Sequence, residues 1–266
     1  GATWRFFGNL PVGQFYHASV DDKKPYNIYG GLQDNGSWVG PSAAAGGVGN
    51  GSWKAINGGD GFWVQPDPLN PGTVYAESQG GEINRINLAT TKAVGIKPQQ
   101  ASGEEKLRWN WNTPIVFGAA NKKNLKKKKK NLYKSVDQGR NWSRISPDLT
   151  TNNKEKQKQD ESGGLSADNT SAENHCTIFT IAESPLDEKM IWVGTDDGNL
   201  QYTLDAGKKW TNVAAYYTKA GIPAQTWLSS IEPSKFDKNI VYATFDNHMY
   251  GDHKTYCAVS KDMGKT

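Results

Sequence analysis

The strongest constraint on the fold is a repeated unit, which is clearest at residues 191–210. It begins with an apolar strand at 191–195, turns at Asp196-Asp197-Gly198, continues as an alternating strand at 199–205 and ends in a turn closed by Trp210. An Asp-Gly turn between two such segments is a strong hairpin signal. The same order returns at residues 26–36, 74–88 and 240–264. Four copies indicate an internally repeated fold.

Each copy follows a short strand that ends at a polar Pro or Asp turn, at residues 16–21, 62–68, 179–185 and 229–233. The segment around each Trp supplies a fourth strand. A composition of 29 Gly, 12 Pro, 10 Trp and 11 Tyr with only 3 Met fits many short strands joined by tight turns. A recurring unit of four antiparallel strands is a propeller blade, so the sequence predicts an all-β fold, a β-propeller.

A sharper motif marks the second turn of the repeat. The Asp carboxylate is expected to accept backbone N–H bonds across the turn, the Gly to supply the left-handed residue and the Trp to pack beneath it. We therefore predict structural roles for all of these residues. The copies are Ser135-x-Asp137-x-Gly139-x-x-Trp142, Thr203-x-Asp205-x-Gly207-x-x-Trp210 and the beginning of a third, Ser260-x-Asp262-x-Gly264.

These turns resemble the Asp-box (BNR) repeats of sialidases, sortilin-type receptor ectodomains and oligoxyloglucan-cleaving glycoside hydrolases. Residues 31–38, 58–62 and 191–198 resemble in particular large bacterial secreted proteins described as sortilin-like or glycosyl-hydrolase-like. The resemblance spans nearly the whole chain. It implies a secreted or cell-surface protein whose propeller has seven or more blades, often with a second propeller in tandem.

By the same comparison the chain holds about four to five blades, and we expect further blades in the same protein. Residues 4–10 would be the last strand of a preceding blade, and residues 153–174 a polar insertion between blades. The expected blades cover approximately residues 11–57, 58–108, 109–172, 173–222 and 223–266.

One stretch departs from the repeat. Aligning Asp137 on Asp205 places the five lysines from Lys126 to Lys130 on residues 194–198, where a strand end and its hairpin belong. Two interpretations are open, a solvated turn or an error in the sequence at this point. Without these lysines the excess of 31 basic over 27 acidic residues becomes 26 against 27. No general basic field remains, so we expect no nucleic-acid partner.

Metal and membrane functions find no support in the sequence. Cys176 and Cys257 lack the close-spaced partners that zinc or redox motifs require, and we expect two unpaired thiols. The histidines lack ligand spacing, and no apolar run is long enough to span a membrane. We therefore predict no metal, no cofactor and no membrane span in this segment.

Propeller topology groups the residues that could bind a ligand. The loop that enters the innermost strand and the hairpin between the second and third strands open onto one face, around the central channel. Aromatic rings beside amides and carboxylates suit sugars or peptides, although turn formation and blade packing explain many such residues equally well. The candidates are Tyr16, His17, Gln33, Asn35, Trp109, Trp111, Asn112, His175, Asp196, Trp227, Asp246 and His248.

Three functions are compatible with these residues. The first is a binding or structural module for carbohydrate or protein ligands. The second is a glycoside hydrolase of the two-propeller xyloglucanase-like type, with Asp34 or Asp60 as a catalytic acid, because hydrolysis needs two carboxyls across a cleft. The third is a scaffold within an extracellular assembly. A sialidase is disfavoured, because the chain has few arginines to bind the substrate carboxylate.

Overall fold

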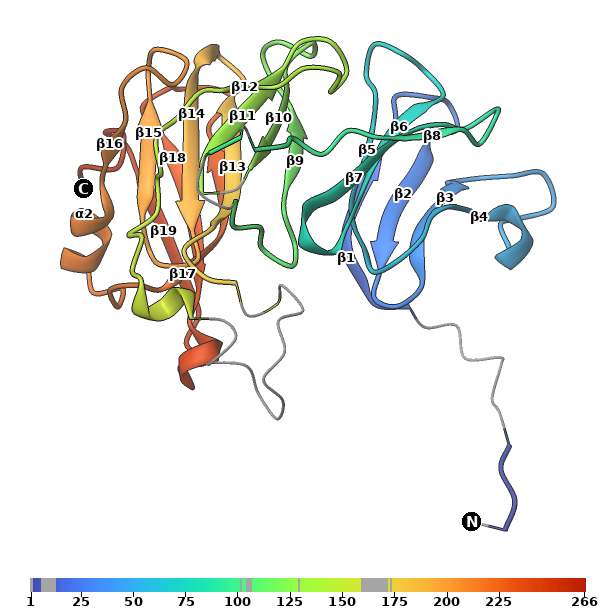
Figure 1. Cartoon of the computed structure of the whole chain (residues 1–266), viewed down its shortest axis with the longest axis horizontal. Helices are drawn as coiled ribbons and strands as arrows, with labels where there is room; N and C mark the ends of the chain where they lie inside the picture. Colours follow the sequence, from blue (N-terminus) through green and yellow to red (C-terminus); the bar gives the residue numbers. More distant parts are fainter. Residues whose placement is uncertain are drawn as a thin grey trace.

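The structure is a computed structural model that describes residues 2–5, 13–100, 102–103, 107–128, 130–158, 172 and 174–266. Five antiparallel sheets follow one another along the chain, and we number them blades 1 to 5 (Figure 1). Blade 1 consists of β1 (Phe15–Val20), β2 (Asn27–Leu32), β3 (Gly36–Pro41) and β4 (Lys54–Asn57). Blade 2 consists of β5 (Gly61–Pro66), β6 (Thr73–Ser78), β7 (Glu82–Asn87) and β8 (Ala93–Gly95). Blade 3 consists of β9 (Ile115–Phe117), β10 (Leu125–Lys128), β11 (Leu132–Ser135) and β12 (Ser143–Arg144). Blade 4 consists of β13 (Ile178–Ser184), β14 (Asp187–Thr195), β15 (Leu200–Thr203) and β16 (Thr211–Asn212). Blade 5 consists of β17 (Trp227–Pro233), β18 (Val241–Asp246) and β19 (Tyr256–Ser260).

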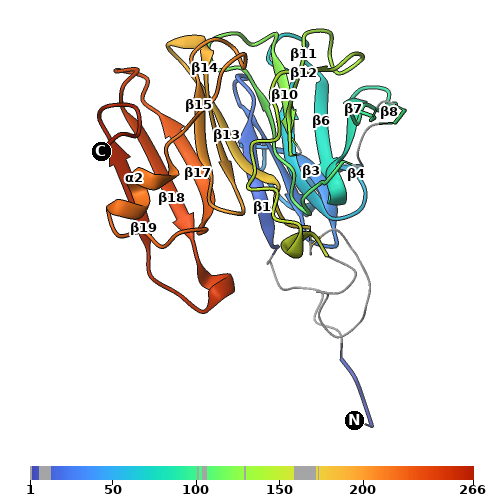
Figure 2. The same ribbon diagram turned by 60° about the vertical axis from the view of Figure 1, so that its left-hand side comes forward.

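Within each blade every strand pairs with the next one along the chain. The first strands of neighbouring blades contact each other, β1 with β5 and β13 with β17, so the first strand of each blade is the inner one. Figure 1 shows blade 3 between blade 4 and blades 1 and 2, and Figure 2 shows blade 5 beside blade 4. This arrangement is a β-propeller of several blades, and the predicted fold class is confirmed.

The observed strands fall close to the predicted ones. Asp196, Asp197 and Gly198 lie in the hairpin between β14 and β15, where Gly194 pairs with Leu200. The pattern did not predict the short helix α2 (Ala214–Lys219) or the four 3₁₀ turns found among the described residues. These turns are η1 (Asn50–Ser52), η2 (Gln79–Gly81), η3 (Glu155–Gln157) and η4 (His248–Tyr250). Residues 6–10 of the expected preceding strand, and residues 159–171 and 173 of the expected insertion, lie outside the described chain.

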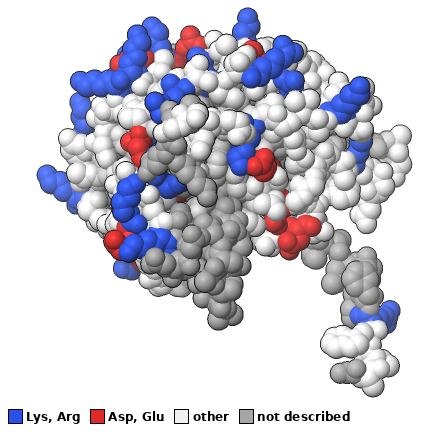
Figure 3. All heavy atoms as spheres, viewed as in Figure 1, with Lys and Arg blue, Asp and Glu red and all other residues white. Residues whose placement is uncertain are grey.

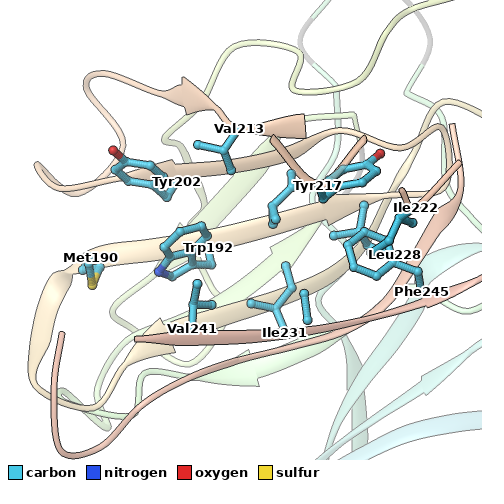
Figure 4. Packing of buried hydrophobic residues seen from close by; sticks show 12 residues of the cluster. Met190, Trp192, Tyr202, Val213, Tyr217, Ile222, Leu228, Ile231, Val241 and Phe245 are labelled. Atoms are coloured by element: carbon cyan, nitrogen blue, oxygen red, sulfur yellow. The ribbon is translucent and has the colours of Figure 1, made fainter. Parts of the chain in front are cut away.

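Apolar rows on facing sheets hold the blades together. Between blades 4 and 5, the fully buried Trp192 of β14 packs with Leu228 and Ile231 of β17 and with Val241 of β18 (Figure 4). Similar buried clusters lie at the other joints, for example around Ile115. Since the blades share these interfaces, burial of apolar surface fixes their spacing.

The turns that carry the Ser/Thr-x-Asp-x-Gly pattern share one set of hydrogen bonds. Ser135 Oγ donates to Asp137 Oδ1 (2.8 Å) and accepts the Gly139 N–H (2.8 Å). The same contacts recur with Thr203, Asp205 and Gly207 and with Ser260, Asp262 and Gly264. Gly139 has φ of +79° and Gln138 before it +63°, so two successive residues are left-handed. The Trp210 indole N–H closes its turn by donating to the Gly207 oxygen (3.0 Å), whereas the Trp142 indole N–H donates to the Ile96 oxygen (2.8 Å), which follows β8 of blade 2.

The lysine run does not form a solvated turn, and that interpretation is wrong for its first residues. Lys126 and Lys127 lie within β10 and are 1% and 0% exposed. Lys126 Nζ forms an ion pair with Glu183 Oε2 of blade 4, which supplies the opposite charge that burial of an ammonium requires. Lys130 is also buried, and residue 129 lies outside the described chain.

Candidate ligand-binding site on the channel face

The candidate residues lie at one end of the blades. Because the strands are antiparallel, the loops entering β1, β5, β9, β13 and β17 lie at the same end as the β2–β3, β6–β7, β14–β15 and β18–β19 hairpins. We call this end the channel face. The Ser/Thr-x-Asp-x-Gly turns lie at the opposite end, which we call the turn face.

A polar hollow of about 470 Å³ opens on the channel face of blade 1. Its lining consists of Gly13, Gln14, Gln33, Asp34 and Asn35. Gln33 is held in place, because its Oε1 accepts the Tyr16 hydroxyl (2.5 Å) and its backbone oxygen accepts the Asn35 Nδ2–H (3.0 Å). Asp34 and Asn35 are exposed. The hollow has the size of a small-ligand site and offers mainly amide and carboxylate groups to a ligand.

Asp34 and Asp60, the two predicted catalytic acids, lie next to each other at the joint of blades 1 and 2. The Asp34 N–H donates to Asp60 Oδ1 (2.7 Å), and the Asp60 N–H donates to Gln79 Oε1 (3.0 Å). Asp60 is only 8% exposed. Its carboxylate therefore anchors the β2–β3 hairpin, whereas Asp34 lines the hollow.

No side chain lies between blades 1 and 2 where their backbones come closest. A Cβ placed on Gly31 would lie 2.1 Å from the carbonyl carbon of Gly61, so the backbones of β2 and β5 are in contact. The Gly36 N–H also donates to the Gly59 oxygen (2.9 Å). Only glycine permits this approach, and it fixes the position of the hollow relative to blade 2.

Aromatic rings extend from the hollow along the inner strands. Tyr16 packs on Phe62 with ring centroids 4.3 Å apart, and Phe62 meets Trp111 edge-on at 5.9 Å. His17 stacks on Trp63 at 3.8 Å. These contacts join β1, β5 and the loop entering β9 into one aromatic wall.

His17 is a neutral member of this wall. Burial lowers its pKa to about 4, against the opposing effect of the Asn112 hydrogen bond. Asn112 Nδ2–H donates to His17 Nε2 (2.9 Å), which connects blade 3 to blade 1. At neutral pH the imidazole therefore acts as a ring and a hydrogen-bond acceptor.

A second aromatic group lies on blades 4 and 5. Trp227 meets His175 at 6.1 Å and Phe179 at 5.3 Å. Burial, and then the nearby Lys156, lower the pKa of His175. Lys156 Nζ donates to Gln225 Oε1 (2.8 Å) and to the Tyr250 hydroxyl (3.3 Å), so η3 is tied to the channel face of blade 5.

Other predicted residues are enclosed or lie apart. Trp109 is 8% exposed and packs against Gly81, which makes it part of the joint between blades 2 and 3. Asp196 is fully buried, accepts hydrogen bonds from Thr177 and Asn110, and has its pKa raised to about 8 by burial and then by Asp197. Neither residue lines the polar hollow.

Asp246 and His248 are exposed at the β18–β19 hairpin of blade 5, where His248 Nδ1 lies 2.5 Å from Asp246 Oδ1. They belong to the channel face but not to the hollow on blade 1. Phe62, Trp63 and Lys156 were not predicted from the sequence. The two adjacent aromatics at the start of β5 break strict alternation, and this was the available signal for Phe62 and Trp63.

Within the described part of the chain, no group of three His, Cys, Asp or Glu side chains is placed to hold a metal ion. No helix among the described residues is long and apolar enough to cross a membrane. On the face seen in Figure 3, basic and acidic side chains are scattered among uncharged surface and do not merge into one basic field.

No family model matches the chain, and no curated protein matches it. Among solved structures it is similar to the GH74 enzyme of Niastella koreensis, with 15% identity, a TM-score of 0.59, and coverage of 92% of this chain and 36% of that one. The GH74 xyloglucanase of Xanthomonas campestris gives 15% identity, a TM-score of 0.52, and coverage of 90% and 35%. An ancestral GH74 enzyme gives 15% identity, a TM-score of 0.56, and coverage of 92% and 31%.

The chain thus spans about a third of the length of these structures. At this identity the likeness establishes the fold, which is a β-propeller. It does not establish the activity.

Proposed function

We propose that this chain is a carbohydrate-binding propeller segment of a secreted or cell-surface protein, and that the sugar binds on the channel face of blades 1 to 3. The observation that carries the proposal is the polar hollow beside the half-buried rings of Tyr16 and Trp111, which both pack on the fully buried Phe62. Sugars present hydroxyl groups at their edges and C–H groups on their faces. Amides with a carboxylate suit the first, and aromatic rings suit the second.

The proposal is tested with a glycan array, followed by titration with xyloglucan oligosaccharides and any other glycan that binds. Gln33→Ala and Asn35→Ala should weaken binding, because both residues line the hollow. Lys92→Ala, an exposed change in the β7–β8 turn on the turn face, is the matched control. Binding of proteins but of no glycan, or glycan binding that both hollow variants leave unchanged, would refute the carbohydrate proposal.

Glycoside hydrolysis is the second candidate, supported by the fold likeness to GH74 enzymes and by the adjacency of Asp34 and Asp60. The contact from the Asp34 N–H to Asp60 Oδ1 favours binding over catalysis, because it commits one of the two carboxylates to the hairpin. Release of reducing ends from xyloglucan is the deciding measurement. Product formation that Asp34→Asn abolishes while binding persists would favour the hydrolase.

We also propose that a further blade packs on the open face of blade 5. Trp192 of blade 4 is buried, and Tyr242 occupies the corresponding place in blade 5 and is 46% exposed. Its cross-strand partner Val259 is 51% exposed. Since blade 5 covers Trp192, a sheet packed in the same way would cover Tyr242 and Val259. Reduced solvent access at Tyr242 in a longer form of the protein, measured by chemical labelling, would support this, and unchanged access would contradict it.

A further inference from the structure

A second cavity lies on the turn face, away from the proposed carbohydrate site. It measures about 490 Å³ and lies between the β1–β2, β5–β6 and β9–β10 turns of blades 1, 2 and 3. We call it the turn-face cavity. Its lining includes Val20, Asp22, Gln65, Pro68, Phe117 and Lys122. This volume falls in the range of ligand pockets.

Two carboxylates in the wall are committed to the turns. Asp21 accepts the Asn27 N–H (2.8 Å) and the Tyr29 hydroxyl (2.9 Å). Asp67 accepts backbone N–H groups in its own turn and the Tyr75 hydroxyl (3.1 Å). These groups shape the cavity, and their side-chain oxygens already have donors.

Asp22 differs from these two residues. Its side chain is 93% exposed, and its Oδ2 lies 3.7 Å from Lys122 Nζ of blade 3. An ion pair this exposed adds little stability, so a cation from a ligand can replace Lys122. The lining carries three carboxylates, Asp21, Asp22 and Asp67, and two ammonium groups, Lys23 and Lys122. The net charge of the lining, two minus three, is −1 and favours a cationic ligand.

The apolar part of the cavity suits an aliphatic group better than a sugar. Val20 is 57% exposed and lies near Pro66, Pro68 and the half-buried Phe117. Tyr29 is only 2% exposed and offers no open ring face on which a sugar could stack. Charge and shape together indicate a ligand with a cation close to a branched aliphatic side chain.

We propose that the turn-face cavity binds a peptide segment in which an arginine or lysine is next to an aliphatic residue. The basic side chain pairs with Asp22 in place of Lys122. The aliphatic side chain lies on Val20 and the prolines. The site is distinct from the channel face, so this proposal stands or falls independently of carbohydrate binding.

The test uses acetyl-Leu-Arg-Leu-amide as the probe and backbone amide NMR shifts of the whole chain as the readout. Saturable shifts are expected at Val20, Gln65 and Gly118, with none at Asn35. Acetyl-Leu-Glu-Leu-amide should bind more weakly. Asp22→Asn should weaken binding of the arginine peptide by about two- to five-fold, as expected for an exposed ion pair, and Val20→Ser should weaken binding of both peptides.

Both positions are exposed, so the variants are expected to fold, and their amide spectra verify this directly. Lys92→Ala, also on the turn face but outside the cavity, should bind as the parent does. Shifts confined to the channel face, equal affinity for the two peptides, or an Asp22→Asn variant with unchanged affinity would each overturn the proposal. Loss of glycan binding in the hollow variants, with these peptide shifts retained, would separate the two sites.

Discussion

Blades 2 and 3 carry different kinds of residue at one equivalent position of their second strands, β6 and β10. In blade 2, Tyr75 of β6 is fully buried and donates to Asp67, eight residues earlier in the same blade. In blade 3 the corresponding residue is Lys126, and Gly118 takes the place of the aspartate. A Cβ on Gly118 would lie 2.7 Å from Glu183 Oε1, so glycine leaves the space that this carboxylate occupies beside Lys126.

The difference separates a local contact from a long-range one. Blade 2 completes its own hydrogen bond, whereas blade 3 relies on a charge from blade 4. On its other side, Lys127 faces Glu77 of blade 2. Burial lowers the pKa of Lys127 to about 8, against the opposing effect of Glu77, and raises the pKa of Glu77 well above its usual value. Blade 3 is therefore joined to blade 4 by the Lys126–Glu183 ion pair and to blade 2 by the Thr113 N–H bond to Glu77 Oε1 (3.1 Å), while Lys127 Nζ has no hydrogen-bond partner within the described residues.

The largest expected effect comes from breaking the long-range pair. Lys126→Met should destabilise the protein by about 3–5 kcal/mol, because it leaves the Glu183 carboxylate buried without its cation. The measurement is the free energy of unfolding from denaturant titration. Lys126→Met combined with Glu183→Leu should recover most of the loss, and the exposed Lys123→Met is the matched control. A single variant as stable as the parent would show that the pair does not join these blades.

The second effect concerns a neutral contact between blades 1 and 3. The pKa of His17 falls from 6.5 to about 4 on folding. The folding stability that depends on neutral His17 is therefore fully present above pH 6.5 and is lost as the pH falls from 6.5 through about 4. The loss should reach about 3 kcal/mol. Unfolding free energies at pH 7, 5.5 and 4 measure it, and His17→Gln should flatten the dependence. An equal acid slope in both proteins would place its origin elsewhere.

The smallest effect comes from the local contact. Tyr75→Phe should reduce stability by about 1–2 kcal/mol, because Asp67 loses one donor and keeps those from Leu69 and Asn70. Tyr29→Phe removes the same bond to Asp21 in blade 1 and should give a similar loss in denaturant unfolding. A Tyr75→Phe loss as large as that of Lys126→Met would remove the distinction between local and long-range contacts.

The sequence predicted the propeller fold because its signals are local. The Asp196–Gly198 turn and the Ser135-x-Asp137-x-Gly139 turn each depend on residues within a few positions. The burial of Lys126 was not predicted for the opposite reason, since its counter-charge lies 57 residues away. The buried Asp196 likewise accepts hydrogen bonds from Thr177, 19 residues earlier, and from Asn110 of another blade.

The candidate site was predicted less completely. Topology grouped Gln33, Asp34 and Asn35 on one face, and in the structure they line the polar hollow. It did not separate Asp34 from Asp60, because the anchoring of Asp60 depends on how two hairpins meet. The turn-face cavity had no signature in the sequence, since its lining comes from three separate turns that become neighbours only when the blades pack.

The glycine contact between β2 and β5 fixes the spacing of blades 1 and 2 at the channel face, where a ligand would be recognised. With Gly31 against Gly61 and no side chain between them, no rotamer change can widen or narrow this joint. The distance from the Gln33 hairpin to the Asp60 loop is thus a main-chain dimension. Substitution of the hairpin side chains can change ligand preference here, while the backbone spacing between β2 and β5 stays the same.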